Sequence, residues 1–165
     1  MRGFHLSGRL AVRQPSGSDS GKVEWDSQGI HQHFVIYSPL GTTVAELDRD
    51  GAGLIHLWMS GQREYTASNA ESLTQGLLGY TLPLDGMPWW VLGQPAPGAP
   101  MAQVVRDGDG HVASLTQEGW QVSYGSWRQV GGQIVPGQLS MKHGDLLLKL
   151  HVDRWVVEQG NGGTP

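Results

Sequence analysis

Short runs in which apolar and polar residues alternate cover most of the first 66 residues of this chain. The runs lie at 4–12, 22–25, 31–38, 42–47, 54–59 and 63–66. A period of two is typical of strands that bury one face. Asp50-Gly51 and Ser60-Gly61 predict turns between them, and the Ser- and Gly-rich stretch 15–21 predicts a loop. This half of the sequence therefore predicts a continuous antiparallel meander.

From residue 68 onward, the spacing of the apolar residues changes from the period of a strand to that of a helix. Ser68 is a suitable N-cap, with Glu71 as its capping-box partner, and leucines recur at helical spacing up to Gly79. A second short helix is expected from about Asp85 to Gly93, with a proline in its first turn. Together they predict a small helical insertion rich in Trp, Met and Leu.

Alternating runs resume after the Pro-rich link 94–100. They lie at 101–106, 111–116, 120–127, 138–142 and 146–157. Hairpin turns are expected at 107–110, 118–119 and 143–145. The pattern predicts a mainly β fold of about eleven strands, formed by a single domain over residues 1–158, with a flexible Gly-rich tail at 159–165.

Composition narrows the possible functions. The chain has 165 residues, 25 of them Gly and 9 Pro, and a net charge of -4, so it lacks the basic balance of a nucleic-acid-binding protein. It has no Cys, which excludes disulfides and thiol chemistry. No apolar run approaches the ~18 residues of a membrane-spanning helix. The sequence begins at Met1 without a signal segment, so we expect either a cytosolic protein or an export signal missing from this sequence.

Motifs that would carry chemistry are weak. Residues 17–23 imitate a phosphate loop, but the glycine spacing is wrong and Val23 replaces the Mg²⁺-binding hydroxyl. His31 and His33 share a strand face and could bind a metal, but without a nearby carboxylate pair a surface role is favoured. Residues 107–110 resemble the start of a calcium loop without its Glu, and a hairpin explains them better. The common hydrolase motifs are missing, and no cofactor is expected.

One turn attracts attention for a different reason. Pro39, Leu40 and Gly41 place a leucine between a residue that breaks strands and one that forms turns, with alternating runs on both sides. An exposed Leu at such a tip would gain roughly 1.5 to 3 kcal/mol from an apolar partner, enough for a reversible contact with a membrane or a protein. The alternative is a leucine folded back onto its own core.

The apolar helices also allow two interpretations. They could fill the interior of a curved sheet, or they could cover a hollow that holds one apolar ligand. The residues alone favour the filled core.

The ordered set of motifs resembles the family of the outer-membrane lipoprotein receptor LolB. The resemblance covers about residues 4–157, and its specificity lies in the order and spacing of individually weak motifs. The motifs are Gly8-Arg9-Leu10-Ala11-Val12, Trp25, Ser38-Pro39-Leu40-Gly41, Tyr65-Thr66-Ala67, Leu78-Gly79, Leu82-Pro83, Trp90-Val91-Leu92-Gly93, Gly119-Trp120-Gln121-Val122-Ser123-Tyr124, Pro136, Leu139 and Trp155.

The resemblance implies an open, half-closed antiparallel β-barrel with a short helical lid over a hydrophobic cavity. It also implies a monomer that accepts acylated lipoproteins from the periplasmic carrier LolA and releases them into the inner leaflet of the outer membrane. Leu40 occupies the position of the leucine that contacts the membrane in the family. We expect the cavity that holds the acyl chains to be lined by Leu10, Trp25, Phe34, Ile36, Leu47, Leu148 and Leu150. We expect Leu73, Leu77, Met87 and Trp90 to form the lid.

Two alternatives stay open. A soluble LolA-type carrier would share the fold, although the Leu40 turn favours the receptor, and a hydrolase is a distant third. Family members are anchored through an N-terminal lipidated Cys, which this sequence does not contain.

Overall fold

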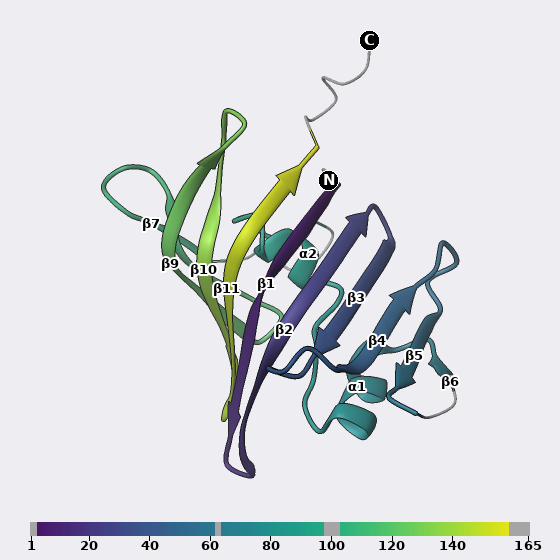
Figure 1. Ribbon diagram of the computed structural model, residues 1–165. Coiled ribbons are helices and arrows are strands. Elements are labelled where there is room, and N and C mark those ends of the chain that lie inside the picture. Colours follow the sequence, from purple (N-terminus) through teal and green to yellow (C-terminus); the bar gives the residue numbers. More distant parts are fainter. Residues whose placement is uncertain (1–2, 62–63, 98–102, 159–165) are drawn as a thin grey trace.

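The computed structural model describes residues 3–61, 64–97 and 103–158 and consists mainly of one antiparallel sheet. Figure 1 shows its strands running side by side, with both helices on one face. The strands are β1 (Phe4–Gln14), β2 (Gly17–Gln28), β3 (His31–Tyr37), β4 (Thr43–Arg49), β5 (Ile55–Met59), β6 (Glu64–Ala67), β7 (Gln103–Arg106), β8 (Val112–Gln117), β9 (Trp120–Val130), β10 (Gln133–His143) and β11 (Leu146–Val157). The helices are α1 (Ala70–Leu78) and α2 (Met87–Trp90).

The strand order is β6-β5-β4-β3-β2-β1-β11-β10-β9-β8-β7. Each half of the chain is therefore a meander, and the two halves join through the pairing of β1 with β11 at the centre of the sheet. In the described part of the chain β6 and β7 are the two edges, so the sheet is not closed. The prediction of a mainly β, open fold with eleven strands is confirmed.

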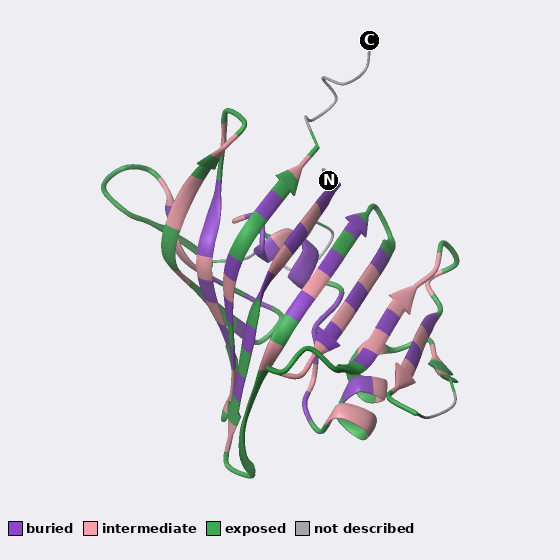
Figure 2. Ribbon diagram, viewed as in Figure 1, coloured by how far each residue is buried: buried purple, intermediate pink, exposed green. Residues whose placement is uncertain are grey.

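Side chains alternate between the two faces of the sheet, as the bands of buried and exposed residues along the strands show (Figure 2). The inner face, toward the helices, carries the core. Its centre is an aromatic cluster in which Trp25 contacts Phe4 and Phe34, with ring centroids 5.0 and 5.4 Å apart. Phe4 also meets Trp155 at 5.3 Å. Because β1, β2, β3 and β11 each contribute one of these rings, the cluster holds the two meanders together.

The long β1–β2 hairpin corrects one prediction. The loop expected over 15–21 is wrong, because β2 already begins at Gly17, which pairs with Gln14. Ser, Asp and Gly give no strand signal, yet pairing with β1 fixes the backbone of these residues. A second hairpin was missed. β9 and β10 extend to Val130 and Gln133, around the turn at 131–132.

The helix ends also differ in part from expectation. Asn69, not Ser68, caps α1, since its side-chain oxygen accepts a hydrogen bond from the Ser72 N–H at 3.0 Å. Gly79 ends the helix as expected, with φ 87°. The second helix is shorter than expected: α2 follows Gly86 and covers only Met87–Trp90. The expected tail at 159–165 lies outside the described residues.

Candidate functional site

The connection between β3 and β4 is a tight turn that presents Leu40 to solvent. The Gly41 N–H donates to the Ser38 carbonyl at 2.8 Å, and the Ser38 N–H donates to the Thr42 carbonyl at 2.7 Å. Pro39 fixes the second position of this turn, and Gly41 adopts φ 94°. The Leu40 side chain is 95% exposed. The turn therefore holds an apolar side chain away from the core, and the alternative of a folded-back leucine is wrong.

A small cavity of about 140 Å³ lies behind this turn on the inner face. Leu10 and Ile36 line it from the sheet, and Leu77 of α1 and Tyr80 line it from the helical side. Burial, and then the negative charge of Asp19, raises the pKa of the Tyr80 hydroxyl to about 12, so this group is neutral near pH 7. The cavity is therefore lined largely by uncharged groups.

The turn and the cavity meet where β2 and β3 separate. The last pair between these strands is Lys22 with Tyr37, and the preceding part of β2 borders the cavity instead. Figure 1 shows the β3–β4 connection running back toward β2 at this place. Pro39 lines the inner cavity and also two grooves on the outer face of the sheet. Ser20 and Pro39 border all three, and Leu40 is the direct neighbour of Pro39 in the turn.

The residues expected to line the acyl chains all face inward. The exposed fraction is at most 8% for Leu10, Trp25, Phe34, Ile36, Leu47, Leu148 and Leu150. Of these, only Leu10 and Ile36 border the small cavity; the others pack within the core cluster. Ligand pockets usually measure about 300–1,000 Å³, so the interior in this conformation is closer to a filled core. The role of these residues in binding acyl chains stays a prediction.

The two helices differ in how firmly they are held. Met87 and Trp90 of α2 are buried, and the Trp90 indole N–H donates to Gln117 Oε1 at 2.9 Å. The same Gln117 side chain exchanges two hydrogen bonds with the Ala96 backbone, and Tyr124 donates its hydroxyl to the Trp90 carbonyl. Buried hydrogen bonds of this kind fix α2 against β8 and β9. The α2 helix is therefore fixed to the sheet and does not pack like a mobile lid.

The α1 helix is held more lightly. Leu73 and Leu77 are only partly buried. The Thr74 hydroxyl oxygen accepts from the Leu82 N–H at 3.0 Å, and the Gln14 amide donates to the Gly79 carbonyl at 2.9 Å. Of the four residues expected in the lid, only Leu77 borders the small cavity. If either helix moves to admit a ligand, the packing favours α1.

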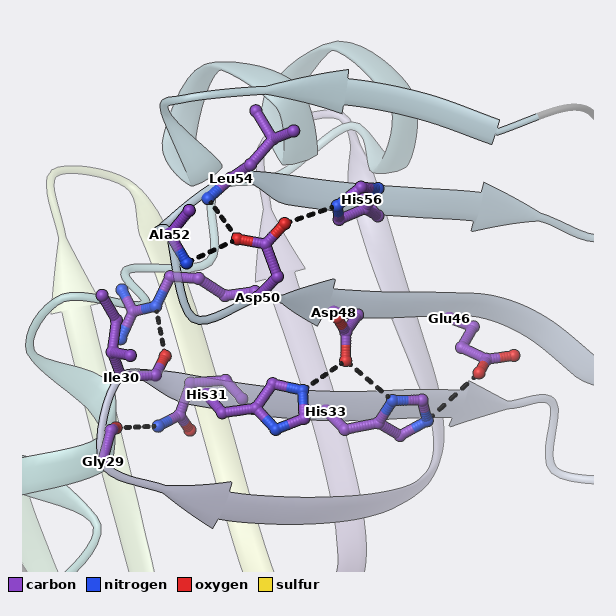
Figure 3. Close-up of polar contacts among 12 residues, drawn as sticks. Gly29, Ile30, His31, His33, Glu46, Asp48, Asp50, Ala52, Leu54 and His56 are labelled. Atoms are coloured by element: carbon purple, nitrogen blue, oxygen red, sulfur yellow. Dashed lines mark hydrogen bonds and ion pairs between the residues drawn. The ribbon is translucent and has the colours of Figure 1, made fainter.

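The outer face of β3, β4 and β5 carries histidines paired with carboxylates (Figure 3). Asp48 lies 3.0 Å from His31 Nε2 and 3.3 Å from His33 Nδ1, and Glu46 lies 3.1 Å from His33 Nε2. The sequence shows no carboxylate pair close to these histidines along the chain, but in the fold β4 brings both acids opposite β3. This half of the outer face is a network of polar contacts.

His56 on β5 belongs to the same network, and we expect it to make stability depend on pH. Its hydrogen bonds to Asp50 and Glu64 raise its pKa above the usual 6.5. A raised histidine pKa adds stability below about pH 6.5 that is lost as the pH rises through the folded-state pKa. The free energy of unfolding in urea should therefore fall between about pH 5.5 and about pH 8.5 by more in the parent than in His56→Asn. Parallel pH curves for the two proteins would contradict this.

Among the described residues, one group has metal-ligating atoms close enough for a single ion: Asp107, Asp109 and His111. Asp107 also accepts hydrogen bonds from the backbone N–H groups of Asp109 and His111, at 2.8 and 3.0 Å. These bonds stabilise the β7–β8 hairpin turn. The interpretation as a hairpin therefore explains the group.

Sequence reasoning missed a group of cations on the outer face of β1, β2 and β11. The two outer grooves beside Pro39 are lined by Arg9, Arg13, Lys22 and Lys149, among others. The signal was present in the alternation of β1, where the exposed Arg9, Ala11 and Arg13 alternate with the buried Leu10 and Val12. None of the helices in the described part of the chain is long and apolar enough to span a bilayer.

Comparison with solved structures supports the fold. A LolA-superfamily protein from Nitrosomonas europaea superposes with a TM-score of 0.59 over 95% of this chain and 86% of its own, at 10% identity. A DUF1329-family protein from Desulfovibrio piger superposes with a TM-score of 0.60 over 96% of this chain and 86% of its own, at 6% identity. At these identities the likeness concerns the fold alone.

Comparison of sequences is more specific. The family model described as outer membrane lipoprotein LolB matches residues 2–155. The outer-membrane lipoprotein LolB of Pseudomonas fluorescens is 33% identical over 93% of this chain and 74% of its own length. The outer-membrane lipoprotein LolB of Nitrosomonas europaea is 37% identical over 96% of this chain and 75% of its own length. With matches over almost its whole length, this chain belongs to the LolB family of outer-membrane lipoproteins.

Proposed function

We propose that this chain acts at the outer membrane, where it accepts lipoproteins from the carrier LolA by their acyl chains and inserts them into the inner leaflet. Family membership supports the receptor function. The observation that carries the proposal is the place of Pro39, which borders the inner cavity while the adjacent Leu40 is 95% exposed. An acyl chain that leaves the cavity there would emerge beside an apolar side chain that can enter a bilayer.

The transfer needs no nucleotide or metal. Each CH₂ removed from water is worth ~0.8 kcal/mol, so an acyl chain moves only along a path that stays apolar at every step. The cavity of about 140 Å³ is the beginning of such a path. Outward movement of α1 would join it to the apolar inner face, where Leu148 and Leu150 lie. In this proposal the filled interior is the unloaded state.

A transfer experiment tests the receptor function directly. A carrier loaded with an acylated lipoprotein is mixed with this chain and then with liposomes of outer-membrane phospholipids. We expect the lipoprotein to pass first to the chain and then to the liposomes. If the chain holds the lipoprotein in solution and never delivers it, the carrier alternative is correct; if it takes up no lipoprotein, the proposal fails.

Filling the small cavity should block uptake. Leu77→Trp places a larger side chain where Leu77 faces Leu10 and Ile36 across the cavity. We expect binding of a fluorescent fatty-acyl probe to weaken by at least about tenfold, since the probe must then displace a packed indole. Ser72→Trp, on an exposed position of the same helix, is the matched control and should bind the probe like the parent. Equal binding by both variants would place the acyl site elsewhere.

A further inference from the structure

The outer face of β1, β2 and β11 is hollowed next to the Leu40 turn. Two adjoining grooves of about 370 and 450 Å³ share Ala11, Ser20, Pro39 and Lys149. Ala11 is paired with Ser20 on one side and with Lys149 on the other. Small side chains therefore form the floor of the grooves, and longer polar side chains surround it.

The surrounding side chains are mostly cations. Arg9, Arg13, Lys22 and Lys149 are exposed and line one or both grooves, in a chain whose net charge is -4. Arg9 forms an ion pair with Asp153 at 3.0 Å. Within the described ranges, the other three form no ion pair with a carboxylate. The first groove also contains one acid, the exposed Asp19. The grooves thus keep a net positive charge.

Stabilisation of the fold does not explain why these cations lie close together. Arg9 and Lys22 are directly opposite each other on neighbouring antiparallel strands. Like charges in this position destabilise a sheet. On the other half of the outer face, by contrast, His31, His33 and His56 are each paired with a carboxylate on a neighbouring strand. An unbalanced cluster beside an otherwise balanced surface indicates an anionic partner.

We propose that the two grooves bind the headgroups of anionic phospholipids while Leu40 enters the acyl region of the same leaflet. Pro39 borders both grooves, so the apolar tip and the cations face the bilayer together. Cations beside a protruding apolar residue are typical of proteins that bind at a membrane interface. The inference rests on the proposed function, because it identifies the lipid surface on which delivery takes place.

The consequence is a preference for anionic membranes. Each Lys or Arg near an anionic surface strengthens binding about fivefold at physiological salt. Leu40 alone gives only a weak and reversible contact. The cations would therefore hold the chain at the surface and orient it, so that the cavity opens toward the lipid.

Binding to cargo-free vesicles tests the inference. The double variant Lys22→Gln/Lys149→Gln is compared with Arg106→Gln/Arg154→Gln, which removes the same charge at exposed positions outside the grooves. Partition is measured by flotation with phosphatidylglycerol-containing vesicles and with pure phosphatidylcholine vesicles. On the anionic vesicles we expect at least about a tenfold loss for the groove variant and less than about a twofold loss for the control. Unfolding midpoints in urea confirm that both variants fold.

Each other outcome overturns the inference. Equal losses for both variants would show a general charge effect. An equal loss on phosphatidylcholine would show that headgroup charge is not recognised. Unchanged vesicle binding with weakened binding to the loaded carrier would assign the grooves to an acidic protein surface. Uptake of the acyl probe by the parent is measured separately, so failure of the proposed function is distinguished from failure of headgroup binding.

Discussion

Replacing Leu40 with glutamate is expected to reduce delivery of lipoproteins to liposomes by at least about tenfold. Transfer of a leucine side chain from water into an apolar medium is worth about 1.5 to 3 kcal/mol, which is a factor of about ten or more in occupancy of the inserted state. A carboxylate also opposes entry into lipid. The side chain is 95% exposed, so the fold loses no packing. Delivery is measured by flotation of the liposomes after transfer from the loaded carrier.

The same variant should accept lipoprotein and unfold in urea like the parent. Ile134→Glu is the matched control, because this side chain is also apolar and 49% exposed but lies on β10, near the β9–β10 hairpin turn. We expect the control to deliver normally. Normal delivery by Leu40→Glu, or a lower unfolding midpoint, would show that the turn has no role in membrane contact.

Replacing Trp25 with alanine is expected to lower the free energy of unfolding by about 3–5 kcal/mol. Its side chain is fully buried and packs between Phe4 and Phe34. Its indole N–H donates to Gln32 Oε1 at 2.8 Å, and the Gln32 amide donates to Ser27 Oγ and to the Gly29 carbonyl. The substitution therefore leaves a cavity and an unpartnered buried amide oxygen. Urea denaturation followed by circular dichroism measures the loss.

Trp25→Phe separates the two contributions. It keeps most of the ring contacts but removes the hydrogen bond to Gln32, so we expect a smaller loss of about 1–3 kcal/mol. Trp58→Phe is a control at a tryptophan that is only partly buried on β5. If Trp25→Ala unfolds at the same urea concentration as the parent, the aromatic cluster does not hold the two meanders together.

Much of the fold could be predicted because most strands carry one apolar face. The alternation around Phe34 and Ile36, for example, gave the correct inward face of β3. The β2 segment at 17–21 could not be predicted, since its Ser, Asp and Gly residues are extended only through pairing with β1. The N-cap of α1 was misplaced by one residue because Ser68 and Asn69 are both good caps and the backbone decides between them.

The site was only partly predictable. Proline and glycine marked the Leu40 turn, and the exposure of Leu40 agrees with that prediction. The degree of filling of the interior depends on packing in three dimensions, which no sequence pattern reports. The cations were overlooked because Arg9 and Lys149 are 140 residues apart in the sequence and meet only through the β1–β11 pairing.

The firm attachment of α2 has a consequence for the order of events. With α2 fixed to β8 and β9, outward movement of the lightly held α1 would open the small cavity beside the place where the β2–β3 pairing ends. This opening would lie beside the surface that we assign to the membrane. A loaded carrier and a bilayer would then compete for one opening. In that case receiving and delivering would alternate in time, and the carrier would have to leave before the lipid approaches.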